Sequence, residues 1–436
     1  MDMANTSISL DDKFNIKKSN VLLNGTQGLV RLMLGQKLRD EKQGLNTAGF
    51  VTGYRGSPLG AVDFQMRRAS KELLASNIKF KEALNEDLAT TALWGAQQAE
   101  LRGEGLYDGV FGLWYGKGPG VDRSGDAMRH ANMAGSSVNG GVLMAMGDDH
   151  SGESSTVLHQ SDLAMIDAGM PILSPAGVQE ILDYGYYGFA LSRYSGLWVG
   201  LKTMKDTIEV TSVVDGDPFR MRFKNPKPKS GADNLNIRLV DTPADQEKRL
   251  LSDKKIAAEE FARINRIDKV GLPKGNAKIG LVAAGKNWLD LIHSLSLLGI
   301  NEPEAKALGI TSYKIVQTWP IDRQSLLEWA DQLDLIIVIE EKRKIIETQI
   351  KDALFSVASK TRVYGGHKNG ENLFSDHGVL DPLEIASELG QIFKEEGCSN
   401  NTLELGLKKI IEVQSTDNAP DLAERLPYFC AGCPHN

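Results

Sequence analysis

Residues 46–77 read NTAGFVTGYRGSPLGAVDFQMRRASKELLASN, and this stretch decides the fold. Its first part, NTAGFVTGY, has the pattern of a buried strand that enters a loop. GAVDFQMRRASKELLASN carries apolar residues at spacings of three and four, which is typical of a helix. Glycine and proline in the intervening RGSPL mark a turn. Strand, turn and helix in this order form the repeating unit of an α/β fold.

The same alternation continues along the rest of the chain. Strand-like runs follow at IKFKEALNE, GVFGLWYGK, GGVLMAMGDD, MPILSP and GLWVGLKT, with helical stretches between them. After a proline-rich, charged stretch the pattern returns in AKIGLVAAGKNWLDLIHSLSLLGI, YKIVQTWPI, DLIIVIEEKRKIIETQIKDALF and SKTRVYGG. We therefore expect a doubly wound parallel sheet, covered by helices on both faces, with a second, smaller α/β domain.

Shifts in composition indicate where these domains begin and end. We interpret 224–276, where proline and charged residues dominate, as an interdomain connection. The expected organisation is an N-terminal extension at 1–20, a first α/β domain at 21–223, this connection, a smaller α/β domain at 277–396 and a polar segment at 397–436.

Charge and composition argue against several classes of function. The 436 residues carry a net charge of −7, and acidic residues are spread along the chain, so we expect no broad basic surface for nucleic acid. The sequence contains no run of about 18 apolar residues, so no membrane span is predicted. The N-terminus, MDMANTSISLDDKF, lacks the basic start and apolar stretch of a signal peptide. Three cysteines do not make a disulfide framework. We expect a cytoplasmic protein.

The turn GYRGSPLGAVD, residues 53–63, is a first candidate for ligand binding. Ser57 is placed to cap the following helix, with Pro58 as its first residue. The helix N-terminus would then offer N–H groups to a carboxylate or phosphate. An ordinary capped turn between strand and helix explains the same residues.

The segment LNEDLATTALWGAQQAEL places Glu86 at the start of a helix that is apolar or small nearly all round. One interpretation is that its charge complements the helix N-terminus. The other is a partly buried carboxylate held for proton chemistry. Position alone does not separate the two.

The segment MGDDHSGESSTVLHQSD is rich in titratable residues and follows a predicted strand. We expect it to form a loop at the edge of an active site. Its spacing matches no known metal signature, so no metal site is predicted. The residues concerned are Asp148, Asp149, His150, Glu153, His159 and Asp162.

The last residues, CAGCPHN, fit no self-contained site. A zinc site would need a second pair of ligands, and Cys398 lies alone and far upstream. Pro434 stands where haem attachment would need histidine. A thioredoxin-like pair should follow a strand early in a domain rather than end a chain.

Taken together, GYRGSPLG, LNEDLATTALWGAQQAE, YGKGPGVDRSGDAMRHAN, GDDHSGESS and FCAGCPHN resemble the indolepyruvate:ferredoxin oxidoreductases. These are long, fused, thiamine-diphosphate-dependent 2-oxoacid oxidoreductases, and the resemblance runs from about residue 20 to the last residue. It implies that 21–223 bind the aminopyrimidine of thiamine diphosphate and that 277–396 form a transketolase C-terminal-like domain. It also implies that CAGCPHN begins a diphosphate-binding domain, so that the chain is the N-terminal portion of the enzyme.

The activity implied by the resemblance is oxidative decarboxylation of indolepyruvate or related aryl 2-oxoacids to acyl-CoA, with electrons passed to ferredoxin. Branched-chain 2-oxoacids are an alternative. Mg²⁺ and iron–sulfur clusters are implied for a part outside this chain, which alone is expected to be inactive. The expected assembly is a homodimer or a complex with a partner chain. Two other hypotheses are a non-catalytic fragment and an assembly module that pairs with a separate diphosphate-binding chain.

The resemblance also implies roles for individual residues. Glu86 matches the glutamate that hydrogen-bonds the pyrimidine ring nitrogen. Arg55, Gly56 and Ser57 match the loop that meets the substrate carboxylate or the cofactor, and His130 is a candidate for substrate contact. We interpret Glu340 and Glu341 as structural or interface residues, so Glu341→Gln is expected to alter activity little.

Overall fold

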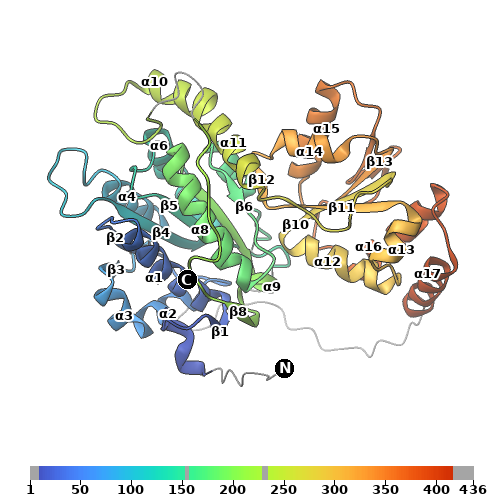
Figure 1. Cartoon of the computed structure of the whole chain (residues 1–436), viewed down its shortest axis with the longest axis horizontal. Helices are drawn as coiled ribbons and strands as arrows, with labels where there is room; N and C mark the ends of the chain where they lie inside the picture. The colour runs from blue at the N-terminus through green and yellow to red at the C-terminus, as the bar shows by residue number, and fades with distance from the viewer. Residues whose placement is uncertain (1–8, 153–156, 228–233, 416–436) are drawn as a thin grey trace.

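The computed structural model describes residues 9–152, 157–227 and 234–415. They form two α/β units side by side, the first at the left and the second at the right of Figure 1. None of the helices in these ranges is long and apolar enough to cross a membrane.

The first unit is built on a seven-stranded sheet in the order β12-β6-β7-β5-β4-β2-β3. All neighbouring strands are parallel except β12 and β6, which are antiparallel. The bounds are β2 (Ala48–Gly53), β3 (Ile78–Phe80), β4 (Val110–Lys117), β5 (Val142–Asp148), β6 (Ile172–Leu173), β7 (Val199–Met204) and β12 (Gln317–Trp319). A two-stranded antiparallel sheet, β1 (Asn20–Asn24) and β8 (Thr211–Asp215), lies beside it.

Helices cover both faces of this sheet, and each face has its own apolar core beneath its helices. One core is shared by helices α1 (Gly25–Lys42), α2 (Val62–Arg68), α3 (Ser70–Ala75), α8 (Val178–Ser195), α9 (Lys205–Ile208) and α11 (Lys255–Asn265). The other lies under α4 (Glu86–Ala96), α5 (Gly118–Arg123), α6 (Gly125–Ala134) and α7 (Asp162–Asp167). The remaining elements are the 3₁₀ helix η1 (Leu10–Phe14), α10 (Pro243–Lys248) and the π-helical turn η2 (Arg249–Lys254).

The second unit repeats the three-layer design on a five-stranded sheet, β14-β13-β10-β11-β9. Its strand LIIVI is buried at every position, as expected for a parallel strand covered on both faces. In Figure 1, α14 and α15 lie above this sheet and α12 and α16 below it. The strands are β9 (Lys269–Val270), β10 (Ile279–Ala284), β11 (Ile310–Ile315), β13 (Leu335–Ile339) and β14 (Arg362–Tyr364), with a hairpin of β15 (His367–Lys368) and β16 (Glu371–Asn372). The helices are α12 (Gly285–Leu297), α13 (Glu302–Leu308), α14 (Arg323–Ala330), α15 (Ile345–Ser356), α16 (Pro382–Glu395) and α17 (Asn401–Gln414).

The segment YKIVQTWPI, predicted as one strand of the second unit, is divided between the two sheets. It leaves the second sheet after β11 and joins the edge of the first as β12. The half-buried carboxylate of Asp268 holds the crossing point, because it accepts N–H bonds from Val316 at 2.7 Å and Gln317 at 3.3 Å. Gln317 also accepts a hydrogen bond from Tyr187 of α8, at 3.1 Å. The segment from β11 to β12 therefore contributes one strand to each sheet and joins the two units directly.

Two stretches that look like linkers in the sequence contain packed helices. In 224–276, α11 packs on α8 and buries Phe261 in the core of the first unit. In 397–436, α17 packs on α16 through Leu403, Leu407 and Ile410. These apolar residues recur at helical spacing, so a narrow apolar stripe is buried although the overall composition is polar.

Candidate active site

Glu86 is the first residue of α4, and its backbone is held from two sides. Asn85 caps the helix by accepting a hydrogen bond from the Leu88 N–H at 2.9 Å. The Glu86 carbonyl accepts from the hydroxyl of Thr90 and from the indole N–H of Trp114 in β4, both at 3.0 Å. The helix start is therefore fixed to the sheet, and Glu86 itself is only 7% exposed.

The side chain of Glu86 lies against the backbone of the YGKGPG segment. A Cβ atom added at Gly120 would lie 2.4 to 2.6 Å from the side-chain atoms of Glu86, and one at Gly116 would lie 3.2 Å from its Cγ. Both glycines are needed for room, since neither has a positive φ. Within the described part of the chain, no group forms a hydrogen bond with the Glu86 carboxylate. The result is a carboxylate in a glycine cradle that forms no hydrogen bond with the described residues.

The turn after β2 differs from the predicted cap. Helix α2 begins at Val62 after Ala61, which makes no side-chain cap, and the Ser57–Pro58 peptide bond is cis. Ser57 is therefore not the N-cap, and Pro58 is not the first helical residue. Two successive turns, with N–H bonds from Leu59 to Gly56 and from Val62 to Leu59, come before the helix.

This turn nevertheless lies at the carboxyl edge of the first sheet. Pro58 and Leu59 contact Gly147 near the end of β5, where a Cβ atom would come within 2.8 Å of the proline ring. Gly56 is buried, Ser57 is half-buried and Arg55 is exposed. Ligands of doubly wound sheets bind at this edge, and α5, which carries Gly120 against Glu86, also begins at it.

His130 lies on α6, away from Glu86. Its side chain is 62% exposed, pairs with Asp126 at 3.7 Å and stacks on Trp94 at a centroid distance of 5.8 Å. Trp94 is eight residues beyond Glu86, which corresponds to about 12 Å along the helix. The structure thus brings Arg55, Gly56, Ser57 and Glu86 to one edge and leaves His130 outside this group.

Asp148 ends β5 at the same edge and is fully buried. It accepts hydrogen bonds from the Ser161 N–H at 3.0 Å and from the Ser161 hydroxyl at 2.5 Å. Burial alone would raise the pKa of Asp148, but the interactions with His159, Lys202 and His150 outweigh it and lower the pKa to about 2. Asp148 is therefore a permanent negative charge at the end of β5.

His159 connects Asp148 with helix α5. Its Nε2 donates to Asp122 of α5 at 2.7 Å, and its Nδ1 lies 3.6 Å from Asp148. Burial alone would lower the pKa of His159, but the interactions with these two carboxylates outweigh it and raise the pKa. The ring packs directly on Gly118, where a Cβ atom would lie 2.2 Å from Nδ1. The first turn of α5 is thus enclosed between His159 on one side and Glu86 on the other.

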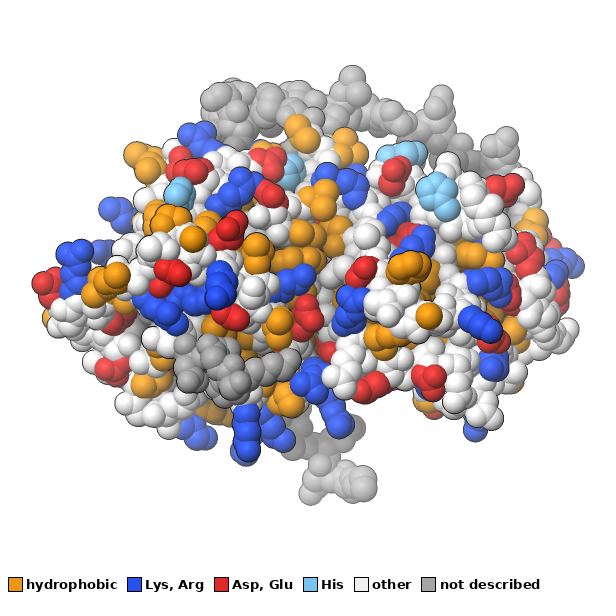
Figure 2. Space-filling view, turned by 90° about the horizontal axis from the view of Figure 1, so that it is seen from above, with side chains coloured by type: hydrophobic (Ala, Val, Ile, Leu, Met, Phe, Trp, Pro, Cys, Tyr) orange, Lys and Arg blue, Asp and Glu red, His pale blue; other side chains and the backbone are white. Residues whose placement is uncertain are grey.

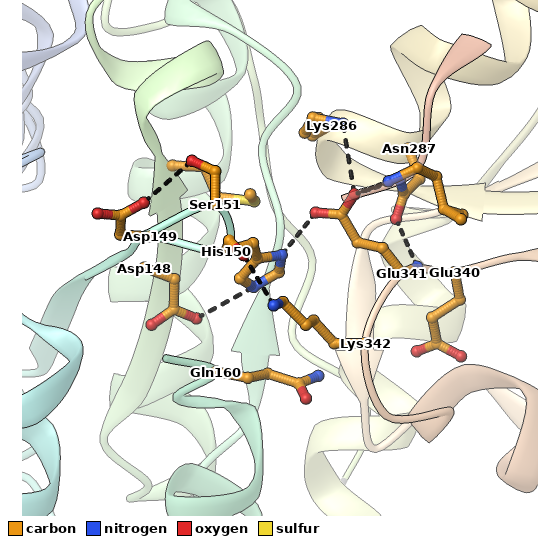
Figure 3. A network of polar contacts seen from close by, with 12 residues as sticks. Asp148, Asp149, His150, Ser151, Gln160, Lys286, Asn287, Glu340, Glu341 and Lys342 are labelled. Carbon is orange, nitrogen blue, oxygen red and sulfur yellow. Dashed lines mark hydrogen bonds and ion pairs between the residues drawn. The ribbon is translucent and has the colours of Figure 1, made fainter. Parts of the chain in front are cut away.

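A second histidine, His150, reaches the other unit (Figure 3). Its Nδ1 donates to Glu341 at 2.5 Å, and its carbonyl accepts from Lys342 Nζ at 2.7 Å. Both side chains of the His150–Glu341 pair are almost completely buried. The second oxygen of Glu341 accepts from Lys286 at 3.3 Å, and from Asn287 and the Leu380 N–H at 3.2 Å.

The charges around Glu341 keep it ionised. Burial alone would raise its pKa, but the hydrogen bond from His150 and the charges of His150 and Lys286 outweigh it and lower the pKa to about 2. Glu340 has a different role, because its carboxylate accepts N–H bonds from Ile345, Ile346 and Glu347 at the start of α15. Burial, only partly offset by these bonds, raises the pKa of Glu340 to about 7.

Within residues 9–152, 157–227 and 234–415, no three His, Cys, Asp or Glu side chains form a group that could hold a metal ion. Glu153 and the terminal CAGCPHN lie outside these ranges. On the face drawn in Figure 2, acidic and basic side chains are interspersed.

Comparisons with known proteins agree with the sequence motifs. Residues 269–417 match the indolepyruvate oxidoreductase domain family. The indolepyruvate oxidoreductase subunit IorA of Methanothermobacter thermautotrophicus is 25% identical over 421 residues, which is 95% of this chain and 60% of that protein. IorA of Pyrococcus abyssi is 25% identical over 435 residues, 99% of this chain and 60% of that protein. This confirms the resemblance to the indolepyruvate oxidoreductases. The chain spans about 60% of the length of these curated relatives.

A solved structure confirms the fold class. The 2-oxoglutarate:ferredoxin oxidoreductase from Magnetococcus marinus, solved with 2-oxoglutarate, coenzyme A and succinyl-CoA bound, superposes with a TM-score of 0.60. The match covers 86% of this chain and 66% of that chain at 14% sequence identity. The α/β architecture with two mostly parallel sheets is therefore the one that the sequence predicted.

Proposed function

We propose that this chain is the pyrimidine-binding portion, with the adjoining domain, of a thiamine-diphosphate-dependent 2-oxoacid:ferredoxin oxidoreductase. The proposed reaction is oxidative decarboxylation of indolepyruvate or a related aryl 2-oxoacid to the acyl-CoA. The observation that carries the proposal is the Glu86 carboxylate, which lies against Gly116 and Gly120 at the carboxyl edge of the sheet without a hydrogen-bond partner among the described residues.

The cradle fits the pyrimidine half of thiamine diphosphate. The carboxylate oxygens of Glu86 are not fully enclosed, so a ligand can supply the hydrogen bonds that these oxygens lack among the described residues. Glu86 would hold the pyrimidine ring by a hydrogen bond to its nitrogen and would keep or share the proton at that atom. When bound, thiamine diphosphate supplies the electron sink for loss of CO₂.

The turn at 54–59 would bind the acid group of the substrate. Arg55 is exposed at the edge of the sheet, and its guanidinium is suited to a carboxylate. Gly56 and Ser57 lie beside it, so the backbone there can approach a ligand closely. This turn would orient the substrate, and Glu86 would hold or share the proton at the pyrimidine nitrogen.

A diphosphate-binding part would complete the site from outside. Leu84 is 86% exposed and Leu88 47% exposed on either side of Glu86, and Leu158 beside His159 is 53% exposed. Exposed apolar side chains around a polar centre are typical of a surface that another domain covers. We assign Mg²⁺, the iron–sulfur clusters and the contacts with coenzyme A and ferredoxin to that part, in a continuous chain, a homodimer or a partner chain.

The test is Glu86→Gln in a complete enzyme that contains this portion. We expect 2-oxoacid-dependent ferredoxin reduction to fall roughly 100-fold or more, because proton transfer by a positioned side chain contributes about that much. The matched control is Asp87→Asn, which removes the neighbouring carboxylate of the same helical turn. Unchanged turnover in Glu86→Gln would remove Glu86 from this role. Failure of the wild-type enzyme to oxidise any 2-oxoacid would contradict the proposed function itself.

A further inference from the structure

The contact between the two units is specific at the level of single atoms. Each oxygen of Glu341 has its own partners, Oε1 on His150 and Oε2 on Lys286, Asn287 and the Leu380 N–H. Charged groups buried this deeply hold their geometry, because each lost partner leaves an uncompensated charge. The position of the His150 ring is therefore dictated by the second unit.

His150 transmits this position to the end of β5. It lies two residues after Asp148, and Figure 3 shows its ring between Asp148 and Glu341. Its Nε2 is buried without a hydrogen-bond partner among the described residues and faces Asp148 Oδ2 at 3.9 Å. Lys342 holds the backbone at the same point through the His150 carbonyl.

From Asp148 the contacts continue to the candidate active site. His159 lies between Asp148 and Asp122, and Asp122 belongs to α5. The first turn of α5 packs on His159 through Gly118 and on Glu86 through Gly120. The polar network and the glycine contacts thus form a continuous physical path from Glu341 to Glu86.

We infer that Glu341, contributed by the second unit, is a positioning residue for Glu86, acting through His150, Asp148, His159 and helix α5. This inference rests on the proposed function of Glu86. It replaces the expectation from the sequence that Glu341→Gln would alter activity little. The second unit thereby holds the carboxyl edge of the first sheet in one geometry.

The first experiment uses the 436-residue chain and needs no activity. Histidine ring and tryptophan indole resonances are recorded by NMR in the wild type and in Glu341→Gln. We expect the signals of His159 and of the Trp114 indole, which is bonded to the Glu86 carbonyl, to shift together with those of His150. A change confined to His150 would overturn the inference.

Two further variants keep this experiment decisive. Glu347→Gln is the matched control, because Glu347 is a buried carboxylate of the same unit that pairs with Lys351 and the Gly366 N–H instead of the first unit. Its spectrum should leave His159 and Trp114 unchanged, and equal shifts in both variants would contradict the proposed path. If Glu341→Gln does not fold, Lys342→Met leaves the His150–Glu341 bond in place, removes the bond to the His150 carbonyl and the charge of Lys342, and should produce the same pattern with smaller shifts.

The second experiment measures turnover of a complete enzyme. Glu341→Gln should lower kcat about tenfold to 100-fold with a smaller change in KM, because a displacement of about 1 Å at a catalytic group costs that much. Glu347→Gln should leave kcat within about twofold. Equal kcat in the wild type and Glu341→Gln would overturn the inference. A wild-type enzyme without 2-oxoacid activity would contradict the proposed function instead, and the NMR result would still decide whether the path exists.

Discussion

The two sheets of this protein use their carboxyl edges in opposite ways. At the edge of the first sheet, Glu86 lies in a cradle of glycine backbone, and none of the described residues hydrogen-bonds its carboxylate. At the edge of the second sheet, Asn287 and Glu341 are fully engaged in hydrogen bonds and ion pairs, and the bond from His150 to Glu341 comes from the first unit. Both edges follow strands of the same kind of fold, but the first carries exposed side chains such as Arg55 and Leu84, whereas Asn287 and Glu341 at the second are buried.

The difference shows that a carboxyl edge is identified as a ligand site by side chains whose hydrogen-bonding groups have no partner in the protein. A buried carboxylate that already has four partners stabilises the structure and has nothing left to bind. One without protein partners keeps its hydrogen-bonding capacity for a ligand. The comparison therefore predicts that changes at the first edge affect activity far more than stability, and that changes at the second edge affect stability strongly.

Gly120→Ala is the strongest test at the first edge, where changes are expected to affect activity far more than stability. The added Cβ would lie within 2.6 Å of the Glu86 carboxyl group, which is the free end of a flexible side chain and can move away. We expect turnover of a complete enzyme to fall by about 100-fold, with an unfolding free energy within about 1 kcal/mol of the wild type. The measurements are steady-state kinetics and urea denaturation of the same sample.

The control for this variant is Gly125→Ala, a glycine at the start of the next helix with nothing within 4 Å of an added Cβ. Alanine should be neutral or slightly stabilising there. If Gly120→Ala keeps full activity, the cradle is not what positions Glu86.

Glu341→Gln tests the second edge through stability. We expect a loss of about 3 kcal/mol in unfolding free energy, since removal of one partner from a buried ion pair leaves the others uncompensated. Glu86→Gln should cost less than about 1 kcal/mol, because its carboxylate has no partner among the described residues to lose. Equal losses in the two variants would remove the distinction between the edges.

The stabilisation contributed by the His150–Glu341 pair depends on pH. The pKa of Glu341 in the folded protein, about 2, is below its ordinary value of 4.5. Its contribution is therefore fully present above pH 4.5 and is lost as the pH falls from 4.5 towards 2. The difference in unfolding free energy between wild type and Glu341→Gln should shrink over this window, and a constant difference would contradict the ion-pair account.

His130→Ala should have the smallest effect. The side chain is mostly exposed, and Trp94, on which it stacks, lies about two helical turns from Glu86. We expect kcat and KM to change by less than about twofold. A large increase in KM for the 2-oxoacid would instead support the substrate contact that the sequence resemblance implies.

The sequence predicted what depends on local pattern. Strand and helix alternation in 46–77 indicated the α/β class, and the apolar helix that follows Glu86 placed this residue at a helix start. The cluster after β5 was also visible as a polar segment following an apolar strand. In each case neighbouring residues carry the information, so periodicity and capping rules apply.

What the sequence did not predict depends on partners far along the chain. His150 and Glu341 are 191 residues apart, and Lys202, which lies 3.8 Å from Asp148, has no motif around it. The transfer of β12 to the first sheet depends on Asp268 and Tyr187, which are also distant in sequence. The Ser57 cap failed because two successive turns come before the helix, which begins only at Val62. The spacing of Gly116 and Gly120 was the one local signal for the cradle that could have been used.

The most direct test of the central claim is a crystal structure of a complete enzyme with thiamine diphosphate bound. The account predicts that a carboxylate oxygen of Glu86 lies within hydrogen-bond distance of the pyrimidine ring nitrogen, with Gly116 and Gly120 beneath it. A pyrimidine ring held by another residue, with Glu86 paired to protein groups, would contradict it.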